Sequence, residues 1–390
     1  MKKKWPSKFA SMNYCILILS VIFVNLSYAN DPGQDIIIGK KVTIESKVLD
    51  ETRTMMVYLP PGYEISDRKY PVLYLLDGRA HFLHASGITH YLARLGNTPP
   101  MIVVAIANID RTRDFSPTHR DERPNTGGAP AFLGFLDKEL IPFIDQSYKT
   151  VPFRILMGHS FGGTFATYCL YTKPDLFNAY ISISPYLQWD ENLLVNQAKK
   201  KLKSSYTKPK FYFMTVGNEP DYFEPLKQFS SVMKMKSENA IDFQYVIMKD
   251  EDHSSIPHIS IYKGLKFIFN DWQLPQYKMR EGLSSVDAHY EQVSQQYGYT
   301  INTPEITVNY IGYTHLGNNE IDKAIEVFVE NVKRYPKSAN VYDSLGEAYE
   351  RNNQLGLASQ NYQKAYDLGI KLSDPNVFVY KQNLERVKKK

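Results

Sequence analysis

A serine between glycines, in the pentapeptide 158–162 (Gly-His-Ser-Phe-Gly), is the residue of this sequence best suited to nucleophilic chemistry. The apolar run 153–157 before it predicts a buried strand, and residues 164–171 after it predict a helix. A G-x-S-x-G nucleophile needs this strand, sharp turn and helix, because small neighbours let the strained turn close. The start of the helix also offers free N–H groups to a developing oxyanion. The sequence therefore predicts Ser160 as the nucleophile.

A serine hydroxyl becomes a good nucleophile only when a general base takes its proton and a third group orients that base. In a sheet of this type the chain order is serine, acid, histidine. His253 follows the predicted strand 243–248 and is the predicted base. His258 is the rival, but it falls at or inside the predicted helix 259–272, so His253 is favoured.

The acid should follow the predicted strand 208–216, where the segment 217–221 (Gly-Asn-Glu-Pro-Asp) offers two carboxylates. Glu219 is closer to the strand end and is preferred, with Asp221 as the alternative acid. Either carboxylate could instead cap the helix predicted from residue 222. An oxyanion hole needs two fixed N–H donors. Phe161 should supply one, and the loop near Arg79 after the predicted strand 70–76 the other.

The elements that must position these residues alternate along the chain. Residues 36–48 and 52–59 predict an antiparallel strand pair; further strands are predicted at 70–76, 101–107, 153–157, 179–184, 208–216 and 243–248, with helices at 80–95, 130–148, 164–171, 191–203, 222–236 and 259–272. This alternation predicts a parallel sheet with helices on both faces. In such sheets chemistry gathers at the carboxyl ends of the strands, where all the candidates above fall.

After residue 275 the pattern changes to helices alone. Two spaced sets match at an offset of 34 residues: Val308, Ile311, Gly312, Ala324 and Phe328 with Tyr342, Leu345, Gly346, Ala358 and Tyr362, and Pro336 closes the first. This period and these residue types are typical of tetratricopeptide repeats. Residues 284–297 predict a helix that precedes them. The sequence thus predicts an α/β domain at 30–274 and a small all-α repeat region at 275–390.

The N-terminus predicts a signal peptide over residues 1–29: a basic start, an apolar core at 14–26 and a small-x-small site at 27–29. Its removal takes four of the 46 Lys and Arg residues and none of the 41 Asp and Glu residues, so the net charge falls from +5 to +1. A nucleic-acid partner is therefore not implied. Cys15 leaves with the signal, and Cys169 remains as a predicted core residue with no disulfide partner. We expect an exported protein, periplasmic or secreted, with no stable membrane span after cleavage.

Four segments together resemble the Putative esterase (esterase D-like) family of α/β-hydrolases: 53–60, 70–78, 158–163 and 252–254. The match covers roughly residues 36–274 in the right order. The family includes siderophore esterases, S-formylglutathione hydrolases, feruloyl and acetyl-xylan esterases, and mycolyltransferases, so it does not specify a substrate. The resemblance implies an α/β-hydrolase sandwich with a mostly parallel central sheet. The tetratricopeptide tail departs from the minimal family pattern.

Carried over position by position, the resemblance implies Ser160 as nucleophile, His253 as base, Glu219 as acid and the Arg79 N–H as second oxyanion donor. It also implies that the charged loop 109–117 borders the site. The implied reaction is two-step acyl transfer on a small-molecule or conjugate ester, with no cofactor and no metal. The loop and the residues just after it carry four arginines, Arg111, Arg113, Arg120 and Arg123. They could favour an acidic or catecholate ester as substrate; the other explanation is that they are solvated charges on an exposed loop.

Two other functions compete with the esterase. An acyltransferase would use the same triad with an alcohol in place of water, and the sequence does not separate the two. A non-catalytic protein would act through its repeats, which are expected to bind a peptide or protein. The complete set of serine, histidine and acid argues against the non-catalytic protein.

Overall fold

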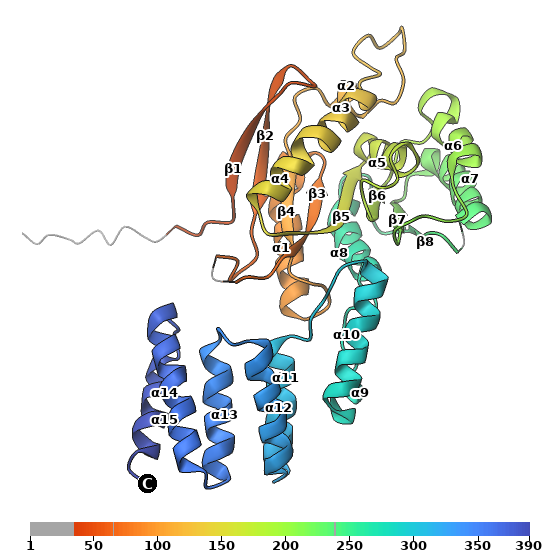
Figure 1. Cartoon of the computed structure of the whole chain (residues 1–390). Helices are drawn as coiled ribbons and strands as arrows, with labels where there is room; N and C mark the ends of the chain where they lie inside the picture. The colour runs from red at the N-terminus through yellow and green to blue at the C-terminus, as the bar shows by residue number, and fades with distance from the viewer. Residues whose placement is uncertain (1–34, 65, 238) are drawn as a thin grey trace, which may run out of the picture. The chain divides into compact units, whose positions relative to one another are not determined.

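One mixed eight-stranded sheet organises the first part of the chain in the computed structural model, which describes residues 35–64, 66–237 and 239–390 (Figure 1). The strands are β1 (Lys40–Ser46), β2 (Glu51–Tyr58), β3 (Tyr70–Leu75), β4 (Ile102–Ile106), β5 (Thr150–His159), β6 (Ala179–Ile183), β7 (Phe211–Val216) and β8 (Asp242–Ile247). Their order is β1-β2-β4-β3-β5-β6-β7-β8. β2 runs antiparallel to β1 and β4, and the other neighbours are parallel. The mostly parallel α/β sheet predicted from the sequence is confirmed.

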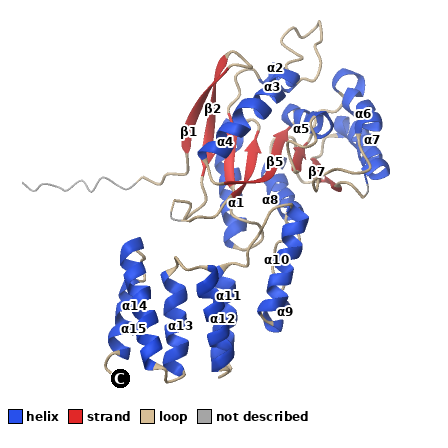
Figure 2. Ribbon diagram, in the orientation of Figure 1, coloured by secondary structure: helices blue, strands red, loops and turns tan. Residues whose placement is uncertain are grey.

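Helices cover both faces of this sheet (Figure 2). One core layer packs beneath α3 (Ala129–Phe135), α4 (Ile141–Ser147), α5 (Phe161–Thr172), α6 (Trp189–Lys201) and α7 (Pro220–Ser237). The opposite layer packs beneath α1 (Gly78–Arg94) and α8 (Ile256–Ile268). The central strands are buried on both faces, which is why they read as continuous apolar runs rather than alternating ones.

Three segments differ from the sequence prediction. The charged loop 109–117 contains a short helix, α2 (Arg111–Phe115), whose first turn is capped by the Asp110 carboxylate accepting from Arg113 N at 2.9 Å. The helix predicted at 130–148 is α3 and α4 joined by a π-helical turn, η1 (Leu136–Leu140). The start of α6 holds three consecutive left-handed residues, 190–192, which no periodicity signals.

A buried arginine joins β2 to α2. The Arg53 side chain is 0% exposed and donates to Asp114 Oδ2 at 2.6 Å, with Glu51 at 2.5 Å. Its guanidinium also lies 5.2 Å from the ring centroid of Phe132. Charges are costly to bury unless they are paired, so this cluster fixes where α2 meets the sheet.

Replacing Arg53 with alanine is expected to lower the free energy of unfolding by about 3–5 kcal/mol, because the Asp114 carboxylate would stay buried without its main partner. Urea unfolding measures this. Arg94→Ala, which removes an exposed arginine at the end of α1, is the control and should change stability by less than about 0.5 kcal/mol. Equal effects in the two variants would contradict the prediction.

Residues after 275 are helical throughout, in α9 (Gln276–Glu281), α10 (Leu283–Tyr297), α11 (Glu305–Gly317), α12 (Ile321–Arg334), α13 (Ala339–Arg351), α14 (Leu355–Leu372) and α15 (Val377–Val387). α15 was not predicted from the sequence. In the pair α11 and α12, a Cβ on Gly312 would lie 2.4 Å from the Phe328 ring; in α13 and α14, a Cβ on Gly346 would lie 2.8 Å from the Tyr362 ring. The two helix pairs therefore pack through the same glycine–aromatic contact.

α10 packs its C-terminal end into the core layer beneath α1 and α8. The Tyr297 hydroxyl donates to the Ile268 carbonyl at 3.0 Å, and its ring lies 5.5 Å from that of Phe153 on β5. Residues Ile38–Lys390 form one compact unit. The domain boundary at residues 274 and 275 stays a prediction.

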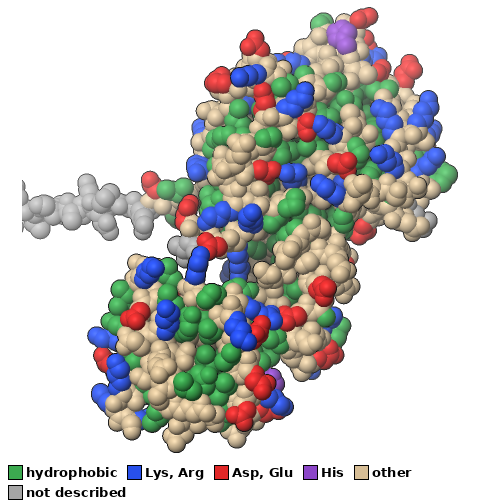
Figure 3. Space-filling view, viewed as in Figure 1, with side chains coloured by type: hydrophobic (Ala, Val, Ile, Leu, Met, Phe, Trp, Pro, Cys, Tyr) green, Lys and Arg blue, Asp and Glu red, His purple; other side chains and the backbone are tan. Residues whose placement is uncertain are grey.

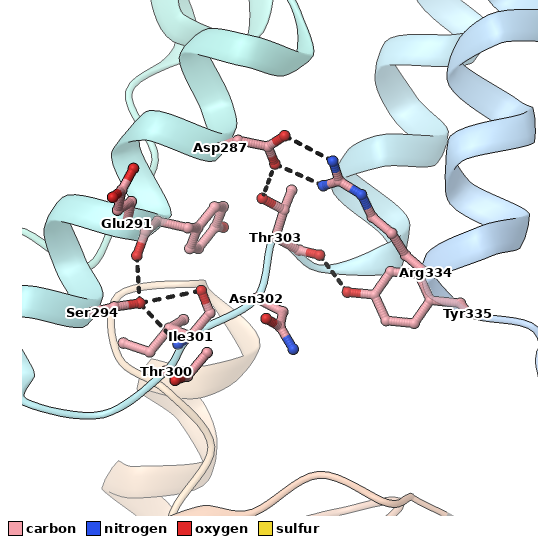
Figure 4. A pocket seen from close by; sticks show the side chains of 10 residues that line it. Asp287, Glu291, Ser294, Thr300, Ile301, Asn302, Thr303, Arg334 and Tyr335 are labelled. Atoms are coloured by element: carbon pink, nitrogen blue, oxygen red, sulfur yellow. Dashed lines mark hydrogen bonds and ion pairs between the residues drawn. The ribbon is translucent and has the colours of Figure 1, made fainter.

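A hollow of about 550 Å³ lies between α10, the segment 300–303 and the end of α12 (Figure 4). Arg334 binds both oxygens of Asp287 at 2.7 and 2.8 Å, and Thr303 donates to the same carboxylate at 2.6 Å. Tyr335 donates to the Thr303 carbonyl. These polar groups already have one another as hydrogen-bond partners. We therefore assign the hollow a structural role, in which its hydrogen bonds connect the segment before α11 to α10 and α12.

The predicted signal peptide, residues 1–29, lies outside the described residues. In the part of the chain that the structure describes, no helix combines the length and apolar character that a membrane crossing requires. Acidic and basic side chains are mixed over the face drawn in Figure 3.

Candidate active site

Ser160 lies at the turn between β5 and α5, at the carboxyl end of the central strand. Its backbone is strained, with φ 57° and ψ −118°, and Ser160 N donates to the Ile183 carbonyl at 2.8 Å. A Cβ on Gly158 would lie 2.1 Å from the Gly162 carbonyl oxygen, so only glycine fits at that position. The backbone here therefore forms the sharp turn between strand and helix that exposes a nucleophile.

His253 lies in the loop between β8 and α8 and is hydrogen-bonded through Nδ1 to Glu219 Oε2. Its ring centroid is 4.6 Å from that of His159, the residue before Ser160. The side chain of His253 is 38% exposed, whereas Glu219 is only 8% exposed. The structure thus brings a histidine, oriented by a buried carboxylate, to the serine turn.

Glu219 is held by groups other than the histidine. Its Oε1 accepts from Ser184 Oγ at 2.6 Å and from Gly217 N at 3.0 Å. Hydrogen bonds of this kind favour an ionised carboxylate and fix its direction. Ser184, which sequence reasoning missed, has φ 39° directly after β6. The positive φ at the end of a buried strand has no sequence signature in a serine.

The two alternatives to these residues point elsewhere. Asp221 is exposed in the first turn of α7, and its backbone carbonyl, not its carboxylate, accepts from Gln188 Nε2 at 3.0 Å. His258 is exposed within α8, where its ring stacks on His84 at 5.4 Å between centroids. The carboxylate bonded to His253 is therefore that of Glu219 and not that of Asp221. The histidine bonded to Glu219 is His253 and not His258.

The two predicted oxyanion donors lie at helix starts. Phe161 is the first residue of α5, and Arg79 is the second residue of α1. The N–H groups in the first turn of a helix have no acceptor within the helix, and the helix dipole favours negative charge there. Both backbone amides are therefore of the kind that stabilises an oxyanion.

An ion pair braces the α1 start against the serine turn. Asp77, in the left-handed region at φ 53°, accepts from Arg111 Nε at 2.6 Å and from Asn108 Nδ2. Arg111 also donates to the His159 carbonyl at 3.0 Å. The charged loop thus borders the site as expected, and Arg111 acts there as a brace between the helix start and the turn.

A series of aromatic rings connects the serine turn to His253; Phe161 and Trp189 are buried, and Tyr186 and Tyr222 are half-buried. Phe161 lies 5.0 Å from Trp189 and 6.3 Å from Tyr186, Tyr186 lies 5.9 Å from Tyr222, and Tyr222 lies 5.5 Å from His253 between ring centroids. Burial raises the pKa of Tyr222, and a hydrogen bond with the Ser160 side chain opposes that rise. The sequence contains 29 tyrosines, but nothing in it shows that Tyr222 meets the nucleophile.

The remaining loop arginines divide into two groups. Arg113 is paired with Glu51 at 2.7 Å and with Asp114 at 2.8 Å. The guanidinium groups of Arg120 and Arg123 lie 5.9 and 5.8 Å from the Trp189 ring centroid. Arg120 is also paired, with Glu122 and with Asp190 at 3.3 Å.

Five histidine rings form a continuous row away from the site. From His253 to His159 the centroids are 4.6 Å apart, from His159 to His81 5.8 Å, from His81 to His84 5.2 Å and from His84 to His258 5.4 Å. Burial lowers the pKa of His159 to about 3 and that of His84 to about 4, and also lowers the pKa of His81. The middle of the row is therefore uncharged at neutral pH.

Acid is expected to destabilise the fold through His84. Because burial lowers its pKa from 6.5 to about 4, the unfolded chain binds a proton there at a higher pH than the folded protein does. The contribution to stability is complete above about pH 6.5 and is lost as the pH falls towards 4. The drop in Tm between pH 7 and pH 5 should be smaller in His84→Gln than in the wild type. The control His90→Gln, on the same helix, should keep the wild-type drop; if His84→Gln keeps it too, the prediction is wrong.

Across the described ranges, no group of three or more His, Cys, Asp and Glu side chains is arranged to hold a metal ion. The one cysteine in these ranges, Cys169, is buried in α5.

Comparison with known proteins identifies the family. The family model described as Putative esterase matches residues 46–253. The chain is 26% identical over 245 residues to the siderophore triacetylfusarinine C esterase of Aspergillus fumigatus, covering 53% of this chain and 84% of the relative. It is 26% identical over 250 residues to the ferri-bacillibactin esterase BesA of Bacillus subtilis, covering 56% and 86%.

Among solved structures, an IroE-like serine hydrolase from Shewanella oneidensis is similar, with a TM-score of 0.62 and 26% identity. The alignment covers 83% of this chain and 99% of that one. The family model spans more than half of the 390 residues. This chain therefore belongs to the Putative esterase family and is a hydrolase that acts on ester bonds.

Proposed function

We propose that this protein is an exported serine esterase in which Ser160, His253 and Glu219 form a catalytic triad. The observation that carries the proposal is the His253–Glu219 pair beside the strained Ser160 turn. A nucleophile, a base and an orienting carboxylate are what acyl transfer requires, and here they come from three separate strand ends.

In the first step His253 Nε2 takes the Ser160 proton while Ser160 Oγ bonds to the ester carbonyl carbon. The amides of Phe161 and Arg79 hold the oxyanion. When the C–O bond of the ester breaks, the protonated His253 gives its proton to the departing alcohol and an acyl-enzyme remains. Water then attacks the acyl carbon with His253 again as base, which releases the acid and restores Ser160.

For the substrate, we propose a siderophore ester. The two relatives described above are a siderophore triacetylfusarinine C esterase and a ferri-bacillibactin esterase by name. The half-buried rings of Tyr186 and Tyr222, 5.9 Å apart between centroids, suit a substrate with flat rings, and the Arg123 guanidinium suits negative charge.

Two further features complete the proposal. The basic and apolar N-terminus directs export, to the periplasm or the medium. The helix pairs α11–α12 and α13–α14 are tetratricopeptide repeats, supported by the shared 34-residue offset and by the Gly312–Phe328 and Gly346–Tyr362 contacts. Two repeats offer a short surface for a peptide or protein partner.

The test is a product analysis with the mature protein, residues 30–390. Bacillibactin, enterobactin and triacetylfusarinine C, each with and without iron, are compared with methyl ferulate and p-nitrophenyl acetate by mass spectrometry. Siderophore hydrolysis with a kcat/KM at least about 100-fold above that for p-nitrophenyl acetate supports the proposal. Turnover of the simple esters alone would reject the siderophore but keep the esterase. Transfer of the acyl group to an added alcohol in preference to water would favour an acyltransferase.

A further inference from the structure

The proposed triad leaves His159 without a role, although its ring lies against the proposed base. His159 follows the glycine of the serine turn, and its centroid is 4.6 Å from that of His253, with the two planes at 43°. Its backbone is fixed by Arg111, which donates to the His159 carbonyl at 3.0 Å. On its other side its ring meets His81 edge-on at 5.8 Å.

The surroundings keep this ring uncharged. The groups that face it are His81 from α1, Asp77 at the start of α1, Arg111 from α2 and His253 from the loop after β8. Asp77 is already bound by Arg111, so no free carboxylate among these groups favours a protonated His159. His159 Nε2 is buried and has no hydrogen-bond partner among the described residues, so no acceptor there would stabilise a protonated ring.

His253 has polar neighbours on its other sides. Glu219 binds its Nδ1, Tyr222 lies 5.5 Å away between ring centroids, and the Asp252 carboxylate precedes it in the loop. Water reaches the imidazole because its side chain is 38% exposed. His159 therefore covers a face that would otherwise be open to solvent, and a hydrated imidazole is protonated more readily than a desolvated one.

We propose that His159 is a positioning residue of this site: braced by His81 and Arg111, it holds an uncharged ring against one face of His253 and excludes water there. The inference rests on the proposed triad. It assigns no proton transfer to His159 itself. His81, which packs against His159, is itself held by a hydrogen bond of 3.0 Å between its Nδ1 and His84 Nε2. The His84 ring in turn stacks on His258 of α8.

The experiment measures the rate of fluorophosphonate labelling of Ser160 in the mature protein from pH 4 to pH 9, which needs no ester substrate. In His159→Ala, water enters beside His253, so the midpoint of the acid limb should move to higher pH by about half a unit or more, and the maximum rate should fall about tenfold. His159→Phe restores a flat neutral ring and should keep the wild-type midpoint. His90→Gln, on α1 but outside the row, is the matched control and should keep both midpoint and rate.

Each outcome decides one point. If His159→Ala is labelled more slowly but the midpoint of its acid limb does not move, His159 has only a structural role and the inference is wrong. If the alanine variant does not fold, judged by its thermal transition, His159→Asn is measured with the same expected shift. Wild-type protein that labels at Ser160 but does not cleave siderophores would reject only the proposed substrate. Wild-type protein that is folded and never labels would overturn the triad, and the role of His159 with it.

Discussion

Replacing Ser160 with alanine is expected to abolish fluorophosphonate labelling and to lower kcat for ester hydrolysis by roughly 10⁶-fold, while the protein stays folded. The reason is that the reaction loses the only atom that bonds to the acyl carbon, whereas the backbone amides of Phe161 and Arg79 remain to polarise a carbonyl. Residual hydrolysis through these amides and binding alone should persist at roughly 10³-fold over water. Labelling with peptide mapping and steady-state kinetics measure both effects.

Ser254→Ala is the matched control, because Ser254 is an exposed serine next to His253 in sequence. Its side chain has no part in the proposed triad, so labelling and kcat should be unchanged. If Ser160→Ala still labels, or if the mapped serine is another one, the nucleophile is not Ser160 and the proposed function is wrong.

Replacing Glu219 with glutamine is expected to lower kcat by roughly 10⁴-fold, with little change in KM. The amide keeps the size of the carboxylate, but it cannot stabilise the imidazolium that forms on His253, and it can present an N–H where Nδ1 needs an acceptor. Because Ser184 and Gly217 also donate to this carboxylate, two further hydrogen bonds must rearrange or weaken. A thermal transition checks that the loss is not one of folding.

Asp221→Asn separates the two candidate acids. Asp221 is exposed in the first turn of α7, so this change should leave kcat within about twofold of the wild type and alter stability by only a few tenths of a kcal/mol. A large loss in Asp221→Asn together with a small one in Glu219→Gln would assign the acid to Asp221 and reject the arrangement around His253 described above.

Much of the fold could be predicted because its signals are local. The buried strands β3 and β4 are short continuous apolar runs, and the serine turn combines a strand end, small residues and a helix start in one segment. Such patterns depend on neighbouring residues only, so they can be recognised before any contact is known. The start of α6 could not be predicted, because residues 190–192 are all left-handed, and Asp and Asn adopt this backbone as single residues rather than in a run. Thr118 donates to Asp190 Oδ2 at 2.6 Å. Thr118 belongs to a loop far away in sequence, so no local pattern indicates this contact.

The sequence by itself determined the order of the elements, the serine turn and the histidine that follows β8. Only the tertiary structure decided which carboxylate meets His253, because Pro220 starts α7 and carries Asp221 onto the exposed side of that helix while Glu219 turns inwards. It also decided that five histidines form one row. His81 and His253 are brought near His159 by different strand ends of the sheet, and no pattern along a chain encodes a distance between residues so far apart.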